Sequence, residues 1–271
     1  MHPRHDPCLR APGWPINPRF DRWDWRLART GGRKASKGPR RLLIHSAGMP
    51  APRTFSQQPL QAPPGSTELL LVRHGASADA IEGTPHELLE GQGNPPLSPI
   101  GREQAELVGA RLAGGDCAAI WVSTLRRTAE TAAPLERRTG LVPVVDADLR
   151  EVFLGEWEGG LFRQKVADQD PIAQRMFAEE SWAVVPGAES DEAFGARLRD
   201  AVNRIAAAHA GDRVVVFSHG AAIGEILAQA SGSRPFAFIG ADNSSISRLI
   251  VTPEQWIVRG FNDTAHLSDS S

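Results

Sequence analysis

Two short apolar runs constrain the fold more than any other feature of this chain. Leu69–Val72 and Val214–Phe217 contain only aliphatic residues and a phenylalanine, with no polar residue to mark an exposed face. Runs of this kind are typical of strands buried on both faces of a parallel sheet. Each is followed at once by a polar residue, a histidine and a glycine, in Arg73-His74-Gly75 and Ser218-His219-Gly220. Because ligands bind beyond the carboxyl ends of such strands, the pattern places two histidines in one crevice.

The region from 67 to 271 alternates predicted strands with predicted helices. Ser98 is an N-cap residue with a proline directly after it, which predicts a helix to about residue 114. Pro143 restricts a predicted strand at 141–145 to an edge or to irregular structure. The other predicted elements are strands at 118–122, 214–217, 245–251 and 256–259, and helices at 126–138, 160–185 with a break at Pro171, 190–210 and 222–230. Together they predict one α/β domain, a three-layer sandwich with a mostly parallel central sheet and helices on both faces.

Residues 1–66 differ in composition from the rest. They are dense in Pro, Gly, Arg and Trp and show neither helical nor strand period, which predicts a disordered, basic N-terminal extension and linker. Eleven of the 30 Lys and Arg residues but only three of the 32 acidic residues fall within 1–48, so the remainder holds 19 basic and 29 acidic residues, a net charge near −10. An interaction arm, or a start site upstream of Met49, are alternative interpretations of this segment.

Composition excludes several classes of partner. An acidic body argues against nucleic acid, since binding to backbone phosphates needs a basic face. No apolar stretch reaches the roughly 18 residues of a membrane helix, so no membrane partner is expected. The two cysteines, Cys8 and Cys117, exclude a disulfide framework and favour a reducing, cytoplasmic location.

Polar clusters follow three of the predicted strands at equivalent positions. They are Arg73-His74, the segment from Ser123 to Arg127, and Ser218-His219. A single cluster would be an ordinary surface turn, but three at one edge of a sheet bring guanidinium and imidazole groups together. Because both groups bind oxyanions, the convergence predicts an anion pocket.

These residues also match the motifs of a known family. They are Leu71-Val72-Arg73-His74-Gly75, Ser123-x-Leu125-x-Arg127-x-x-Glu130-Thr131, Leu149-Arg150-Glu151 through Gly155-Glu156-Trp157-Glu158-Gly159, and Ser218-His219-Gly220. From residue 68 to about 267 the chain resembles the histidine phosphatase superfamily, also called phosphoglycerate mutase-like, and within it the phosphatase branch. The resemblance implies the phosphoglycerate mutase-like fold for the domain 67–271.

The resemblance also implies a role for each matching residue. His74 is the expected nucleophile, which takes the phosphoryl group as phosphohistidine. Arg73, Arg127 and His219 are expected to surround the phosphoryl oxygens, and neither a metal nor another cofactor is expected. Glu151 matches the proton donor, with Glu158 as the competing carboxylate.

Further residues are candidates for holding the rest of a substrate. Ser77, Trp157 and Arg163 are expected to contact it, with Arg175 as a second candidate for an additional anionic group. The segment 160–190 is the predicted lid. Residues 91–96 are expected to be a plain loop rather than a phosphate cradle, and Arg126 is expected to be a solvated surface charge.

The choice between hydrolysis and mutase chemistry rests on two missing asparagines. Mutases of the resembled family carry asparagine after both histidines, where this chain has Ala80 and Ala221. Losing groups that would hold a phosphorylated acid favours water as the acceptor. We therefore expect a phosphomonoesterase acting on a small phosphorylated metabolite. Mutase activity, a catalytically silent binding module and a phosphohistidine protein phosphatase are the alternatives, and the resemblance is compatible with a homodimer.

Overall fold

The computed structural model describes residues 55–57 and 62–270. The extension predicted for 1–66 therefore lies almost wholly outside the described residues. The described residues from 62 to 270 belong to one compact unit, which contains all of the elements described below. No described helix combines the length and the apolar character that crossing a membrane requires.

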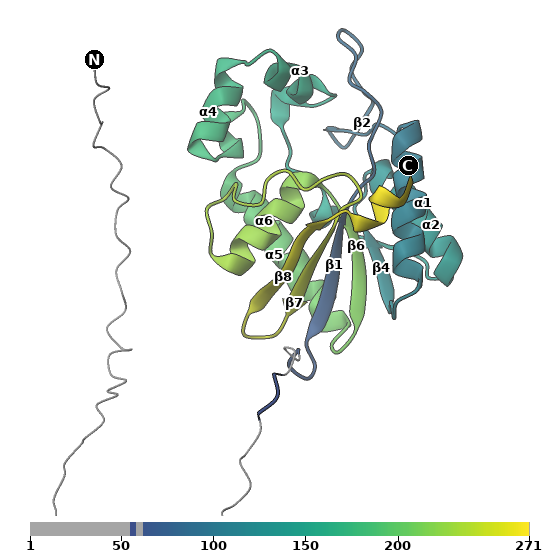
Figure 1. Cartoon of the computed structure of the whole chain (residues 1–271). Helices are drawn as coiled ribbons and strands as arrows, with labels where there is room; N and C mark the ends of the chain where they lie inside the picture. The colour runs from purple at the N-terminus through teal and green to yellow at the C-terminus, as the bar shows by residue number, and fades with distance from the viewer. Residues whose placement is uncertain (1–54, 58–61, 271) are drawn as a thin grey trace, which may run out of the picture. The chain divides into compact units, whose positions relative to one another are not determined.

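A six-stranded sheet in the order β5-β4-β6-β1-β7-β8 forms the centre of this unit (Figure 1). Its strands are β1 (Thr67–Arg73), β4 (Ala119–Val122), β5 (Val144–Val145), β6 (Arg213–Ser218), β7 (Ile246–Val251) and β8 (Trp256–Asp263). The first four in spatial order run parallel, whereas β7 is antiparallel to both neighbours. The prediction of a mostly parallel sheet is confirmed, with the two closing strands supplying the antiparallel part.

Alternate residues of the buried strands point into two separate cores. Leu69 and Leu71 of β1 face one core, and Val72 faces the other. The first core is covered by α5 (Asp191–Ala208) and α6 (Gly220–Ser231), the second by α1 (Pro99–Ala113) and α2 (Arg126–Thr139). This arrangement is the predicted three-layer sandwich. Because both faces of the sheet are covered, the central residues of β1 and β6, Leu69–Val72 and Val214–Phe217, are all apolar.

Capping residues place the helix ends where the sequence predicts them. The Ser98 and Ser190 hydroxyls accept hydrogen bonds from the first turns of α1 and α5. Pro171 begins a new helix, so the predicted helix at 160–185 is in fact α3 (Leu161–Ala167), α4 (Pro171–Glu179) and the 3₁₀ turn η3 (Trp182–Val184). Figure 1 shows α3 and α4 beyond the carboxyl ends of the parallel strands, where the predicted lid belongs.

The strand expected at 141–145 is limited to β5, two residues long at the sheet edge, as the restriction by Pro143 predicts. One local prediction needs correction. The plain loop expected at 91–96 begins instead with a small hairpin, in which β2 (Leu88–Leu89) pairs with β3 (Gln92–Gly93). Short 3₁₀ turns complete the fold: η1 (Ala147–Leu149), η2 (Gly155–Trp157) and η4 (Ala265–Ser270).

Candidate active site

The two histidines lie side by side because β1 and β6 are adjacent parallel strands. Arg73 pairs in register with Ser218, and the His74 amide donates to the Ser218 carbonyl at 3.0 Å. The imidazole centroids of His74 and His219 are 5.1 Å apart in an edge-on arrangement. The structure thus brings together the two residues that the sequence placed in one crevice.

His74 is held as a neutral imidazole with one free nitrogen. Its Nδ1 lies 2.7 Å from the Gly75 carbonyl, which can only accept, so Nδ1 carries the proton and Nε2 is left with a lone pair. Burial lowers the pKa of His74 well below its ordinary value, and the nearby charges of Arg127 and Arg73 lower it further. The ring therefore presents an unprotonated nitrogen at neutral pH, as nucleophilic attack requires.

His219 is completely buried beside it. Its Nε2 lies 2.8 Å from the Ser123 hydroxyl, and its Nδ1 has no partner among the described residues. Desolvation is the main cause of a pKa lowered well below the ordinary histidine value. His219 does not itself line the cavity described below, although Gly220 and Ala221, which follow it, do.

Two guanidinium groups lie near His74, the half-buried Arg73 and the buried Arg127, and neither has a described carboxylate at hydrogen-bond distance. Arg73 donates to the Ala241 carbonyl, while its Nε is buried with no partner. Arg127 is 8 % exposed, donates to the Gly93 carbonyl at 2.9 Å, and has its pKa lowered to about 10 by burial. Buried charge of this kind is costly unless it is paired, so the arrangement favours an anionic ligand. Arg126, by contrast, is half exposed and pairs with Glu130, as expected of a surface charge.

Glu151 lies at the amino end of α6, next to the two histidines. Its carboxylate accepts hydrogen bonds from the amides of Ala221 at 3.2 Å and Ala222 at 3.1 Å. Unpaired amides at a helix N-terminus attract negative charge, which fixes the carboxylate on the cavity wall. The negative charge of Glu151 also raises the pKa of both Arg73 and Arg127, partly opposing the lowering of each pKa by burial.

Glu158 occupies the same cavity and joins it to the hairpin. Its two oxygens accept from the Gly93 amide at 2.7 Å and from the Leu154 amide at 2.9 Å, and burial raises the pKa of Glu158. The hairpin also buries Gln92, whose side-chain amide donates to the Glu151 carbonyl at 2.8 Å. Sequence reasoning missed Gln92 because its position depends on these contacts with segments about 60 residues away.

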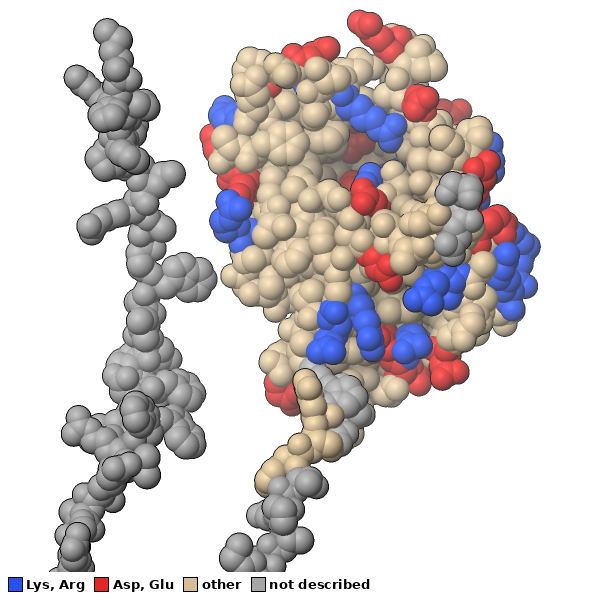
Figure 2. All heavy atoms as spheres, viewed as in Figure 1, with Lys and Arg blue, Asp and Glu red and all other residues tan. Residues whose placement is uncertain are grey.

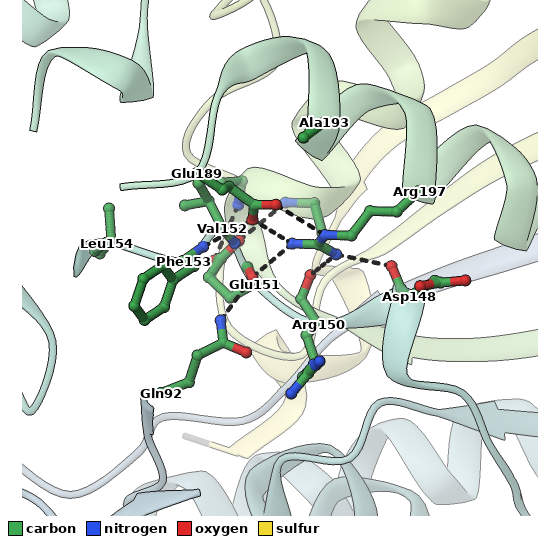
Figure 3. A network of polar contacts seen from close by, with 12 residues as sticks. Gln92, Asp148, Arg150, Glu151, Val152, Phe153, Leu154, Glu189, Ala193 and Arg197 are labelled. Carbon is green, nitrogen blue, oxygen red and sulfur yellow. Dashed lines mark hydrogen bonds and ion pairs between the residues drawn. The ribbon is translucent and has the colours of Figure 1, made fainter. Parts of the chain in front are cut away.

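A half-buried arginine of α5, Arg197, holds the segment that carries Glu151 (Figure 3). Arg197 donates to the carbonyls of Asp148, Arg150 and Glu151, each at 2.8 Å. It also forms a two-point ion pair with Glu189, which in turn accepts from the Phe153 amide at 2.8 Å. The backbone on both sides of Glu151 is therefore fixed to one helix.

A cavity of about 500 Å³ is lined by the nucleophile candidate and the charged and polar residues around it: His74, Arg73, Arg127, Glu151, Glu158 and Gln92. The substrate-contact candidates Ser77, Trp157 and Arg163 all lie on its wall, and Arg163 donates to the Ser77 hydroxyl at 2.7 Å. Phe162, Phe177 and Trp182 of the predicted lid line it too. Arg175 does not, because it lies on the surface of α4 paired with Glu179. A larger hollow of about 640 Å³ lies at the opposite ends of the strands and holds none of the candidate residues.

The described residues contain no group of three or more His, Cys, Asp or Glu side chains arranged to hold a metal ion. The charged groups of the cavity are instead three arginines and two glutamates around His74. Such a set can bind an oxyanion, offer it a nitrogen nucleophile and exchange a proton with it.

Comparison with known proteins identifies relatives that are phosphatases and mutases. The sequence profile of the histidine phosphatase superfamily (branch 1) matches residues 69–264. Over 207 residues the chain is 30% identical to "Probable phosphoglycerate mutase GpmB" of Yersinia enterocolitica, covering 74% of this chain and 94% of that one. It is 29% identical over 209 residues to the metal-independent phosphoserine phosphatase of Arabidopsis thaliana, covering 74% and 84%.

A solved structure, that of a mycobacterial glucosyl-3-phosphoglycerate phosphatase, has 31% sequence identity and a TM-score of 0.63, with 73% of this chain and all of that one covered. These relatives are phosphatases and mutases, and they support a phosphatase enzyme. The profile match over most of the chain and the cavity built around His74 agree, and the chain belongs to the histidine phosphatase superfamily.

Proposed function

We propose that the protein hydrolyses phosphomonoesters through a phosphohistidine formed on Nε2 of His74. One observation carries the proposal: a neutral imidazole with its Nδ1 tied to the Gly75 carbonyl lies between two guanidinium groups that lack carboxylate partners. Positioning and charge stabilisation are what phosphoryl transfer needs most from a protein. The arginines supply both for the phosphoryl oxygens.

The first half-reaction transfers the phosphoryl group to the enzyme. The Nε2 lone pair attacks phosphorus as the bond to the ester oxygen breaks, and Glu151 in its protonated form donates a proton to the departing oxygen. The phosphorylated ring carries a positive charge, which the Gly75 carbonyl stabilises through Nδ1. The alcohol leaves with the proton of Glu151.

The second half-reaction restores the enzyme. Water attacks phosphorus opposite Nε2 and gives a proton to the Glu151 carboxylate, the bond between nitrogen and phosphorus breaks, and inorganic phosphate is released. His74 recovers its lone pair and Glu151 its proton. Arg73 and Arg127, which line the cavity, hold the non-bridging oxygens in both steps. Nδ1 of His219 is buried without a partner beside His74, and we propose that it donates to an oxygen of the phosphoryl group bound there, although the ring does not itself line the cavity.

Mutase activity is the second candidate, because one relative at 30% identity is named as a probable phosphoglycerate mutase. Against it, Ala80 and Ala221 occupy the positions where mutases resembling this family carry asparagine. We also propose a small phosphorylated metabolite, rather than nucleic acid or a membrane, as the substrate. A cytoplasmic location is supported by a cysteine content of two.

The decisive experiment measures both free phosphate and 2-phosphoglycerate from a panel of phosphomonoesters that includes 3-phosphoglycerate, with excess chelator present. We expect phosphate release that survives chelation and is abolished in His74→Ala. His209→Ala is the matched control, because His209 bonds to Trp121 outside the cavity and should keep its turnover. Isomer formation without phosphate would make the protein a mutase, and appreciable turnover in His74→Ala would exclude His74 as the nucleophile.

The proton donor is tested through the leaving group. Glu151→Gln should slow alkyl phosphates, whose alcohols leave poorly, by about 100-fold, and p-nitrophenyl phosphate far less, because nitrophenolate needs little protonation. Glu158→Gln is the comparison, since it removes charge from the same cavity but leaves Glu151 in place. If only Glu158→Gln shows the dependence on the leaving group, the acid is Glu158.

A further inference from the structure

We infer that the substrate of this cavity is the phosphomonoester of an apolar, ring-bearing alcohol. The inference rests on the proposed function and adds to it the class of the leaving group. It comes from the separation of the cavity wall into a charged end and an aromatic end.

The charged end is confined to the surroundings of His74. Arg163 belongs to it although it comes from α3, because its guanidinium donates to the Ser77 hydroxyl at 2.7 Å and to the Ala78 carbonyl at 3.1 Å. Its positive charge contributes to lowering the pKa of both His74 and Arg73, which places it near the nucleophile. Three arginines thus face the phosphoryl group, and Arg163 is occupied there.

The other end is a wall of aromatic rings that pack against one another at tilted angles. Trp157 lies 6.3 Å from Phe162, and Phe162 lies 6.1 Å from Trp182, measured between ring centroids. Behind them Phe236 packs on Trp182 at 4.8 Å. Because Trp157 and Trp182 are 4 % and 8 % exposed, this wall is already ordered before a substrate binds. Figure 2 shows that the surface between α4 and the mouth of the cavity around His74 is mostly uncharged.

Polar side chains near the aromatic end are already engaged. Both oxygens of Glu158 accept backbone amides, and the amide nitrogen of Gln92 donates to the Glu151 carbonyl. Of the described residues that line the cavity, His86 offers a buried Nε2 with no partner. The leaving group can therefore find a hydrogen bond at His86 or at the side-chain oxygen of Gln92, but the described side chains at this end supply no paired partners for a carboxylate and an ammonium.

Desolvation then decides between substrate classes. A phosphorylated amino acid or glycerate would place its carboxylate against tryptophan and leucine side chains, and an unpaired buried charge is strongly disfavoured. A ring-bearing leaving group would bury apolar area and stack against Trp157, Phe162 or Trp182, which is favourable. The same wall therefore rejects the first class and holds the second.

The test compares three esters of primary alcohols: 3-phenylpropyl phosphate, glycerol 3-phosphate and phosphoserine. Because 3-phenylpropanol is the least acidic of the three alcohols and so the poorest leaving group, a higher kcat/KM for its ester reports binding of the leaving group rather than its chemistry. We expect 3-phenylpropyl phosphate to exceed the other two by about tenfold or more. Equal or better hydrolysis of the two hydrophilic esters would overturn the inference and leave the proposed function standing. No His74-dependent phosphate release from any ester would overturn both.

Variants in the aromatic wall show whether it is the cause. Phe162→Ala should lower the ratio of kcat/KM for 3-phenylpropyl phosphate to that for glycerol 3-phosphate several-fold. Phe177→Ala is the second variant, because Phe177 lines the cavity with 44 % of its surface exposed and its loss threatens folding least. Ile100→Ala removes an apolar side chain that is 63% exposed and lies outside the cavity, and it should leave the ratio unchanged. A ratio that stays constant in both phenylalanine variants would contradict the inference.

Discussion

Ser123 controls which nitrogen of His219 can hold a ligand. The Ser123 hydroxyl lies 2.8 Å from His219 Nε2 and 3.0 Å from the Thr128 hydroxyl. Thr128 has its own proton acceptor, the Leu125 carbonyl at 2.8 Å. When Ser123 donates to Nε2, the ring proton sits on Nδ1, the atom that has no protein partner and that a phosphoryl oxygen would need as a donor.

Ser123→Ala should therefore lower kcat by about 10- to 100-fold. This is less than the roughly 100- to 1,000-fold cost of deleting an oxyanion donor outright, because the His219 ring stays in place. The tautomer can be read directly from the ¹⁵N chemical shifts of the His219 ring, which a purely structural role of Ser123 would not move. Ser231→Ala is the control, because Ser231 is a partly buried serine that bonds to a helix carbonyl at the far end of α6. Unchanged ¹⁵N shifts together with normal turnover would rule out this role.

At the scale of elements, α5 is tied to the segment 148–151 through one residue. Arg197 of α5 donates to the carbonyls of residues 148, 150 and 151, and its guanidinium also forms an ion pair with Glu189 (Figure 3). Its side chain is 20% exposed, so these bonds are partly shielded from water. Arg197 therefore acts as a positioning residue for Glu151.

Arg197→Met should lower kcat for alkyl phosphates by about 10- to 100-fold, since a misplacement of about 1 Å can cost that much, and should affect p-nitrophenyl phosphate less. Arg204→Met is the matched control on the same helix. Arg204 is 46% exposed and pairs with the side chains of Asp146 and Asp148, so its loss should cost less than about 1 kcal/mol and leave turnover intact. Equal losses on both kinds of substrate would mean that Arg197 serves folding alone.

The sequence alone predicts some of these elements and contacts but not others. β1 and β6 and their histidines were predictable, because a fully apolar strand must be central and parallel neighbours end at one edge. The apolar face of α5 was predictable from the spacing of its apolar residues, which follows the period of a helix. The residues of that face are all buried: Phe194, Leu198, Val202 and Ile205. Arg197 lies between these residues, and its partners are backbone carbonyls, which no side-chain pattern reveals. The hairpin that buries Gln92 depends likewise on one carboxylate, Glu158, meeting the Gly93 amide.

For the whole molecule, the active site makes stability depend on pH. His74 and His219 are 6 % and 0 % exposed, and burial lowers the pKa of each well below the ordinary 6.5. In the unfolded chain both histidines titrate near that ordinary value. As pH falls through about 6.5, the unfolded state therefore takes up protons that the folded state refuses, and the free energy of unfolding decreases. Above that pH both states are neutral and the effect is absent.

We expect the two histidines together to remove up to about 2.7 kcal/mol of stability for each pH unit below 6.5, until the pH approaches their folded-state pKa values. Urea unfolding at a series of pH values between 8 and 5 measures the slope. His74→Gln and His219→Gln should each reduce this slope by the contribution of one proton, about 1.4 kcal/mol per pH unit, because glutamine does not titrate. The double variant should reduce it by the contribution of two protons. Carboxylates that pair in the folded state add their own slope at lower pH, and that part should be identical in all four proteins. A slope between pH 6.5 and 5.5 that is the same in the double variant as in the native chain would show that neither histidine is held neutral by burial.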